Sequence, residues 1–282
     1  MDNIIGGFAP IFIYAIIFAL NALLPGRWVT GYITKPNSPE KMSYHLNGFA
    51  VFFILIIIWF LLGYFDIVPF DYLYNYRWYG LAGAFITGIV FTIGLVLRYP
   101  PVRKSFIADL FLGRIENLQF RGGRVDVKMW LYLTGATLLG LNALSFTAHH
   151  YILYGDQAST GILLSTALIL YFVLDYLIFE EVHLFTYDLF AERIGFKLCW
   201  GCMVFYPYFY SVFLWATVDL PDPQTPVWLL AIYVLIFFVG WILARGANMQ
   251  KYFFKRNPGK AFLGIVPETI TDGNKTLLVN GF

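Results

Sequence analysis

The segment Val227–Ala244 reads V-W-L-L-A-I-Y-V-L-I-F-F-V-G-W-I-L-A and contains no charged side chain. A helix of roughly 20 apolar residues crosses the hydrocarbon core of a bilayer, and it satisfies its backbone hydrogen bonds internally. The segment therefore predicts a transmembrane α-helix.

Six further apolar runs have a length that suits a bilayer, and they occur along the whole chain: Phe8–Leu24, Phe49–Phe65, Trp78–Leu97, Trp130–Ala148, Gly161–Phe179 and Phe196–Val218. The chain is 59% hydrophobic and only 13% charged, whereas soluble domains carry about 25% charged residues. We therefore expect an all-α fold, a polytopic transmembrane helix bundle with about seven spans. The net charge of +2 gives no indication of a nucleic acid partner.

Charge is distributed unevenly among the connecting loops. The loop Arg98–Lys128 carries seven cations, and cations also follow the first and seventh runs, whereas the loop after the fourth run holds only Asp156. Because Lys and Arg mark the cytoplasmic side, we expect the odd-numbered loops to be cytoplasmic.

Five carboxylates lie between Asp175 and Glu192, in a stretch whose flanks are apolar and rich in aromatic residues. Charged groups beside a bilayer are costly and are often functional. In one continuous helix, Glu181 and Asp188 would share a face. A carboxyl surrounded by aromatic rings has a raised pKa, which suits a general acid. The alternative is a solvated amphipathic loop helix.

Directly after the opening segment comes R-G-A-N-M-Q-K-Y-F-F-K-R-N-P, from Arg245 to Pro258. Its four cations have two interpretations: anchoring of the span by the positive-inside rule, or a site for phosphate groups. The interleaved amides Asn248 and Gln250 favour a ligand site, because anchoring does not require them. Both this cluster and the carboxylates are predicted to face the cytoplasm.

Other motifs predict no separate chemistry. Cys199-Trp200-Gly201-Cys202 opens an apolar run, so helix packing is favoured over redox activity. No histidine spacing matches a zinc site, and we predict no metal. No glycine-rich G-x-G-x-x-G follows a strand, so a dinucleotide would have to be held by side chains between helices.

Two signatures resemble the sterol reductase family, which includes the C14 and C24 sterol reductases, 7-dehydrocholesterol reductase and the membrane domain of the lamin B receptor. The central signature falls on Asp175, Glu180, Thr186, Asp188, Gly195, Phe196, Trp200, Gly201, Pro207 and Tyr210. The later signature, N-x-Q-K-x-x-F-R-x-N-P, falls on Asn248, Gln250, Lys251, Phe254, Lys255, Asn257 and Pro258. Leu23–Gly26, Leu46-Asn47-Gly48 and Asp126-x-Lys128-Met129 resemble the family's amino-terminal half.

The resemblance implies NADPH-dependent reduction of a sterol carbon–carbon double bond by proton addition and then hydride addition. It implies an acid region of Glu180, Asp175 and Asp188 with Tyr176 or Tyr187. It implies that Lys251 and Lys255 bind the phosphates of NADPH, supported by Arg245, Asn248 and Gln250. We expect residues 1–282 to form a single transmembrane domain, in which 1–160 are amino-terminal spans and 161–282 are the sterol and cofactor half.

The resemblance also has departures. Ile178 and Phe179 replace a tyrosine and an asparagine of the family, and Lys255 replaces an arginine. The family continues beyond Gly281-Phe282 with a W-G-x-x-R-H-x-N-Y segment and a tyrosine-rich motif that help to enclose the cofactor. We therefore expect either a fragment or shortened form, or a chain that is not an active reductase by itself.

Two other functions remain open at this point: a non-catalytic sterol-binding scaffold and an isoprenylcysteine-type membrane methyltransferase. A transporter that uses the carboxylates as proton sites is disfavoured, because the sequence shows no broken helices in symmetric repeats. A sterol reductase with membrane lipid around it would lie in the endoplasmic reticulum membrane of a eukaryote, or in the inner membrane of a bacterium.

Overall fold

The computed structural model describes residues 2–35, 38–273 and 275–281. The chain forms two compact units, each made of segments distant in sequence. The first unit comprises Met1–Val29, Tyr44–Ile178 and Glu192–Thr225, and the second comprises Thr30–Ser43, Phe179–Ala191 and Pro226–Phe282.

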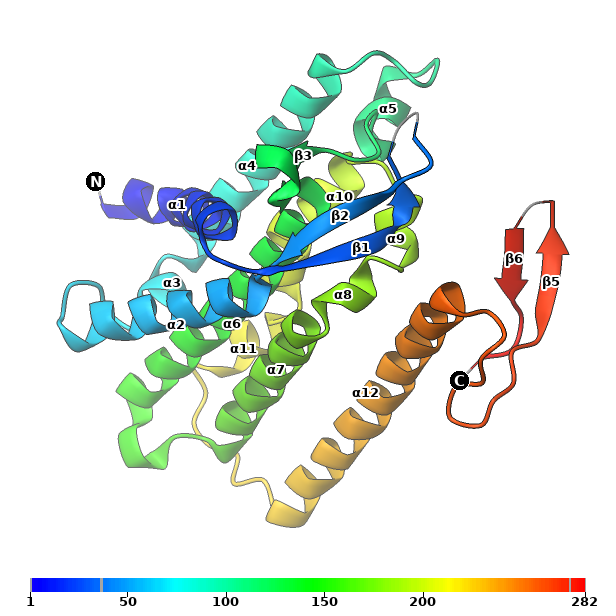
Figure 1. Ribbon diagram of the computed structural model, residues 1–282. Helices are drawn as coiled ribbons and strands as arrows, with labels where there is room; N and C mark the ends of the chain where they lie inside the picture. The colour runs from blue at the N-terminus through cyan, green and yellow to red at the C-terminus, as the bar shows by residue number, and fades with distance from the viewer. Residues whose placement is uncertain (1, 36–37, 274, 282) are drawn as a thin grey trace. The chain divides into compact units, whose positions relative to one another are not determined.

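The first unit is helical apart from short strand pairs (Figure 1). Its α-helices are α1 (Asp2–Leu23), α2 (Gly48–Tyr64), α3 (Tyr72–Asn75), α4 (Arg77–Arg98), α5 (Phe106–Leu112), α6 (Val127–Tyr154), α7 (Thr160–Ile178), α10 (Phe196–Trp200) and α11 (Val212–Thr217). It also has strands β3 (Gln119–Phe120) and β4 (Val125–Asp126), the turns η1 (Arg121–Gly123) and η2 (Gly155–Gln157), and the π-helix η3 (Gly201–Phe209).

The second unit contains the longest helix of the described chain, α12 (Val227–Arg256), with the short helices α8 (Glu180–His183) and α9 (Tyr187–Phe190). After α12 come the paired strands β5 (Thr269–Asp272) and β6 (Lys275–Leu278). The strands β1 (Arg27–Thr34) and β2 (Lys41–Leu46) pair with each other in a two-stranded sheet.

All seven predicted runs are helical, and six of them are long and apolar enough to cross a membrane. The remaining run, α2, has 17 residues, at the short end of what a bilayer requires. The prediction of an all-α, polytopic membrane protein is therefore confirmed.

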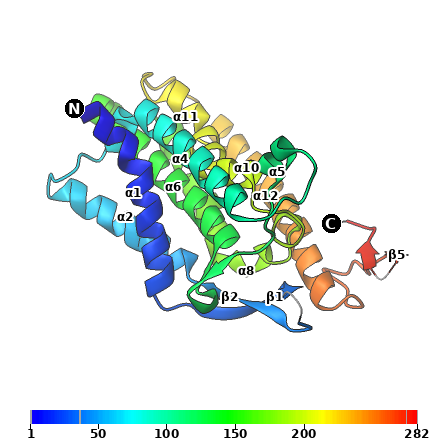
Figure 2. The same ribbon diagram turned by 90° about the horizontal axis from the view of Figure 1, so that it is seen from above.

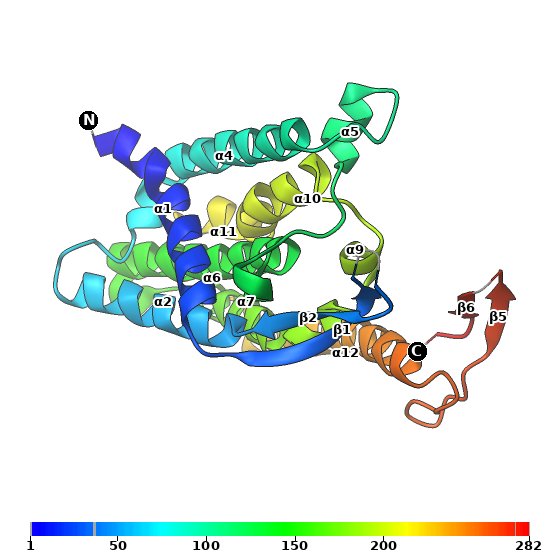
Figure 3. The ribbon, with the colours of Figure 1, turned by 45° about the horizontal axis from the view of Figure 1, so that its top comes forward.

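Helix α6 forms the core of the first unit, where it contacts α1, α2, α7 and η3 (Figure 3). Its buried residues include Leu131, Leu138 and Phe146 together with polar Asn142. Of its span, 78% is buried, whereas 28% of the span of α4 and 33% of that of α7 is buried. A span that is hydrophobic on all sides suits contact with lipid, while polar groups on a buried span find partners in neighbouring helices.

Helices α1 and α4 lie against each other (Figure 2). The two helices come close together at Gly83, where an added Cβ would lie 1.8 Å from the carbonyl oxygen of Gly7. Small residues permit such close packing between membrane helices. Any larger residue at Gly83 would force the two helices apart.

The run Phe196–Val218 is helical as predicted, but it is not α-helical throughout. The helix widens into η3, which contains Pro207. Proline has no N–H to donate to the preceding turn, and in a π-helix the acceptor there is the carbonyl oxygen five residues earlier. The hydroxyl of Tyr14 on α1 donates to the Met203 carbonyl oxygen at 2.6 Å, and the Asn142 amide on α6 donates to the Pro207 carbonyl at 3.1 Å. Neighbouring helices thereby satisfy the backbone groups that the altered geometry exposes.

Candidate active site

The cationic end of α12 presents most of its predicted site residues on one face. Arg245, Asn248, Lys251 and Lys255 recur at spacings of three and four residues, which places them along one side of an α-helix. Viewed along the helix axis, Gln250 is rotated about 100° from Lys251, away from this face. Its side chain is buried. Four of the five predicted cofactor residues therefore share a face, and Gln250 does not.

Lys255 is held by surrounding groups, whereas Lys251 is exposed. The Lys255 ammonium donates to the carbonyl oxygen of Phe185 at 2.7 Å and lies 3.4 Å from the ring centroid of Phe190 and 4.7 Å from that of Tyr32. Aromatic faces attract a cation in this position. Lys255 is thus held by three groups, while the Lys251 side chain is exposed.

Arg245 lies two turns earlier and is partly buried. Its guanidinium is 4.7 Å from the ring centroid of Phe179. Phe179 therefore provides a stacking surface for Arg245, a predicted cofactor residue.

Sequence reasoning missed a polar cluster on the same face of α12. The Tyr252 hydroxyl donates to Glu181 Oε1 at 2.5 Å, and the Arg256 guanidinium pairs with the same carboxylate oxygen. The Arg256 guanidinium also lies 4.7 Å from the Tyr252 ring centroid. The spacing of four between Tyr252 and Arg256 was a readable signal, but nothing in the sequence linked them to Glu181.

The carboxylate segment is not one helix, which overturns the hypothesis that Glu181 and Asp188 share a helical face. Helix α7 ends at Ile178, and α8 and α9 are separate single turns. Glu180 is buried at the start of α8. Asp188 and Tyr187 on α9 are exposed, and the Tyr187 ring packs edge-on against Phe190, with centroids 5.7 Å apart.

Asp175 and Tyr176 lie on α7 and belong to the first unit, whereas Glu180, Asp188 and the α12 residues belong to the second. Asp175 is buried. The Tyr176 ring lies near three other aromatic rings, with centroid distances of 6.0 Å to Tyr206, 6.2 Å to Tyr132 and 6.5 Å to Phe172. The structure thus surrounds Tyr176 with aromatic residues of α6, α7 and η3.

Cysteine and histidine residues form no metal centre among the described residues, where no group of three or more His, Cys, Asp or Glu side chains converges. Cys199 and Cys202 are thiols outside any disulfide, and both are buried in the helix packing. His149 lies between two carboxylates, with Nδ1 3.0 Å from Asp71 and Nε2 3.3 Å from Asp219. His149 therefore links Asp71 and Asp219, which follow different helices of the first unit.

The fold defines the class of this molecule as a polytopic, helical integral membrane protein. The chain belongs to the Ergosterol biosynthesis ERG4/ERG24 family, whose sequence pattern matches residues 8–282. The resemblance to sterol reductases is therefore confirmed.

Individual relatives are proteins named Delta(14)-sterol reductase. The one from Arabidopsis thaliana is 27% identical over 96% of this chain and 74% of its own length. The one from Methylotuvimicrobium alcaliphilum is 30% identical over 94% of this chain and 62% of its own length. The Gallus gallus protein, Delta(14)-sterol reductase LBR, is 29% identical over 94% of this chain, and the match spans only 42% of that relative.

Proposed function

We propose that this chain reduces a carbon–carbon double bond of a sterol with NADPH as the reductant. The observation that carries the proposal is membership of the ERG4/ERG24 family across residues 8–282. The relatives named as sterol reductases match along nearly the whole of this chain. The charge pattern of the loops supports a catalytic site that faces the cytoplasm.

The chemistry of the α12 face fits a phosphate-bearing cofactor. Lys251 offers an exposed ammonium, and the Lys255 ammonium has three N–H groups, of which the Phe185 carbonyl takes one. Charge-assisted hydrogen bonds from such groups to phosphate are short and strong. Asn248 and Arg245 on the same face would add further donors, and Gln250 would support the helix from its buried side. When bound, NADPH supplies the hydride.

Proton donation falls to a carboxyl or a tyrosine of this chain. An alkene is a very weak base, so its protonation requires a well-placed acid in a site from which water is excluded. Glu180 and Asp175 meet the burial requirement, and Tyr176 stands beside Asp175 in an aromatic environment. Exposed Asp188 and Tyr187 would serve only if bound substrate covered them.

The sterol would occupy the membrane-embedded, aromatic part of the chain. Phe172 and Tyr176 of α7 lie near Tyr206 of η3, and Tyr206 lies 4.9 Å from Tyr210 between ring centroids. Flat aromatic faces suit the apolar ring system of a sterol. Access from the bilayer would spare the substrate a transfer through water.

The proposal is tested by sterol product analysis and nucleotide binding on the purified protein. We expect NADPH-dependent turnover, and we expect Glu180→Gln to abolish it while NADPH still binds, because the amide keeps the shape but removes the proton. Glu40→Gln is the matched control, since Glu40 is exposed and pairs with Lys35 at 2.6 Å in the β1–β2 loop.

Other outcomes would redirect the assignment. Turnover of Glu180→Gln within a few-fold of the original would move the acid role to Asp175 or a tyrosine, tested next by Asp175→Asn. Sterol binding without any NADPH binding would favour a non-catalytic scaffold. Retention of S-adenosylmethionine in place of NADPH would favour a methyltransferase.

A further inference from the structure

Helix α5 presents an unusual surface for a short connecting helix. It follows the membrane span α4 after the extended residues Tyr99–Pro101. Phe106, Ile107 and Phe111 point outward with exposed fractions of 49%, 76% and 50%. Large apolar side chains clustered at this exposure mark a surface that contacts another apolar phase.

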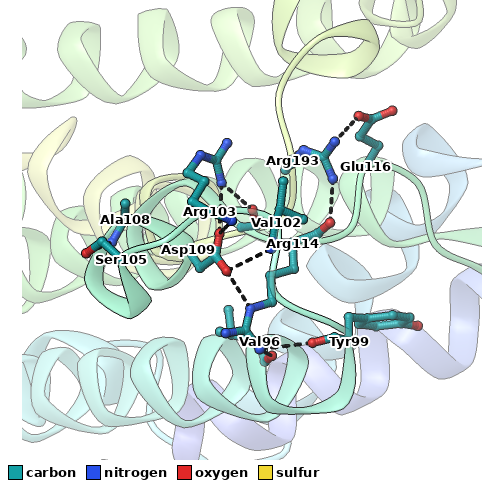
Figure 4. Close-up of polar contacts among 11 residues, drawn as sticks. Val96, Tyr99, Val102, Arg103, Ser105, Ala108, Asp109, Arg114, Glu116 and Arg193 are labelled. Atoms are coloured by element: carbon teal, nitrogen blue, oxygen red, sulfur yellow. Dashed lines mark hydrogen bonds and ion pairs between the residues drawn. The ribbon is translucent and has the colours of Figure 1, made fainter.

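The opposite face of α5 is fixed by a buried carboxylate (Figure 4). Asp109 is fully covered and accepts hydrogen bonds from the backbone N–H groups of Val102 and Arg103, both at 3.1 Å. Arg114 Nε donates to it at 2.8 Å, and Arg103 Nη1 lies 3.3 Å away. Burial raises the pKa of Asp109, but these hydrogen bonds and the arginine charges outweigh burial and hold the pKa below its usual range. The anchored carboxylate prevents α5 from rolling its apolar face inward.

Arg114 also sets the position of α5 relative to the span. Its Nη1 donates to the carbonyl oxygens of Val96 at 2.6 Å and Tyr99 at 2.9 Å, at the carboxyl end of α4 (Figure 4). The last carbonyls of a helix have no partner within the helix. A membrane-spanning helix ends near the headgroups, so this contact places α5 at the level of the bilayer interface.

The charges around this apolar face are positive. Arg98 ends α4 and Lys104 precedes α5, and both are exposed. The nearby acid Glu116 is paired with Arg193 at 2.6 Å. The surface therefore combines apolar side chains with exposed cations, the combination that favours the interface of a membrane containing acidic lipid.

We propose that α5 is an interfacial helix that inserts Phe106, Ile107 and Phe111 among the headgroups of acidic phospholipids, while Arg98 and Lys104 contact the headgroup phosphates. The partner is the bilayer surface itself. The proposal is independent of sterol reduction, and its test measures no catalytic activity.

The depth of α5 is measured on the full chain reconstituted in phospholipid nanodiscs. Cys199 and Cys202 are replaced by alanine, and Ile107→Cys carries an environment-sensitive dye. We expect quenching by lipids that bear a nitroxide near the headgroup and protection from aqueous iodide. The matched control is Asp156→Cys in the polar turn η2, where iodide should quench and nitroxide lipids should not. Circular dichroism and gel filtration confirm that each labelled protein is folded.

The charge part of the proposal has its own comparison. Phosphatidylcholine nanodiscs with added phosphatidylserine should shift the Ile107 dye to shorter wavelength than phosphatidylcholine alone. The Arg98→Gln/Lys104→Gln variant should lose that lipid-dependent shift. High salt should weaken the shift in the unsubstituted background, because salt screens exposed charges.

Two results would overturn the proposal. Iodide quenching of the Ile107 dye at every lipid composition would show that α5 faces water. Protection from both iodide and nitroxide lipids would show that protein, such as a second copy of this chain, covers the surface.

Discussion

Lys251 and Lys255 lie one turn apart on α12, yet their surroundings differ. Lys255 contacts a carbonyl and two aromatic rings, while Lys251 is exposed. The sequence placed both in one cationic signature and could not distinguish them, because the groups that hold Lys255 come from distant segments around Tyr32 and Phe190.

We predict that Lys251→Ala weakens NADPH binding roughly tenfold to a hundredfold, which is what the loss of one charge-assisted contact produces. If Lys251 binds the 2′-phosphate, NADH binding should change little. Lys255→Ala should weaken NADPH binding and also lower thermal stability, because its packing contacts disappear. The measurement is nucleotide titration by fluorescence or calorimetry.

Lys260→Ala is the matched control, because Lys260 is exposed beyond the end of α12. Equal weakening of NADPH and NADH would place Lys251 on the pyrophosphate. Unchanged binding of both nucleotides would return Lys251 to a role in membrane anchoring.

Asp126 provides a pH-dependent prediction. It caps α6 by accepting hydrogen bonds from the N–H groups of Lys128 at 3.0 Å and Met129 at 3.2 Å. Burial raises the pKa of Asp126 from 3.8 to about 6 against the effect of these hydrogen bonds. The folded protein therefore binds this proton more tightly than the unfolded chain, and the free energy of unfolding falls as pH rises through that interval.

We expect Asp126→Asn to remove this fall and to raise the free energy of unfolding at pH 7 by about 2–3 kcal/mol, since asparagine still caps the helix without a buried charge. Thermal unfolding in detergent across this pH range measures the effect. Asp156→Asn, in an exposed turn, should leave the profile unchanged. A steep pH dependence that survives in Asp126→Asn would show that another group is responsible.

At the scale of elements, the apolar runs were sufficient to predict where the helices lie, but not their internal geometry. Pro207 was visible in the sequence. The backbone carbonyls of η3, however, accept hydrogen bonds from side chains of α1 and α6, and nothing in the sequence indicated these partners. The carboxylate segment was likewise not predictable in detail. Its residues could have formed one helix, but the structure divides them between α8 and α9.

Tyr14→Phe tests how far η3 depends on its neighbours. Loss of the hydroxyl leaves the buried Met203 carbonyl without the 2.6 Å hydrogen bond, which should cost about 1–3 kcal/mol. We expect a lower thermal unfolding temperature in detergent. Tyr233→Phe on the exposed surface of α12 should not shift it. Equal unfolding temperatures for Tyr14→Phe and the unsubstituted protein would mean that the π-helical geometry is stable without this contact.

At the scale of the whole molecule, membrane class and family followed from the sequence because both depend on local pattern. The distribution of site residues between two units did not, because each unit is assembled from segments far apart in the chain. Asp175 and Glu180 are only five residues apart, yet they fall in different units. The assignment of residues 161–282 as the functional half stays a prediction.

The burial of α6 has a consequence for how the protein is made. Its span has a mean hydropathy of 1.2, against 2.6 for α12, and it carries Asn142, His149 and His150. Polar residues lower the free-energy gain of a segment that leaves the translocation machinery for lipid. We expect α12 alone to insert efficiently in a glycosylation-mapping assay with microsomes, and α6 alone to pass through into the lumen in a large fraction of chains. Efficient insertion of both isolated segments would contradict this. If α6 alone inserts poorly, as we expect, it enters the bilayer only after α7 and η3 have been synthesised and can pack against it.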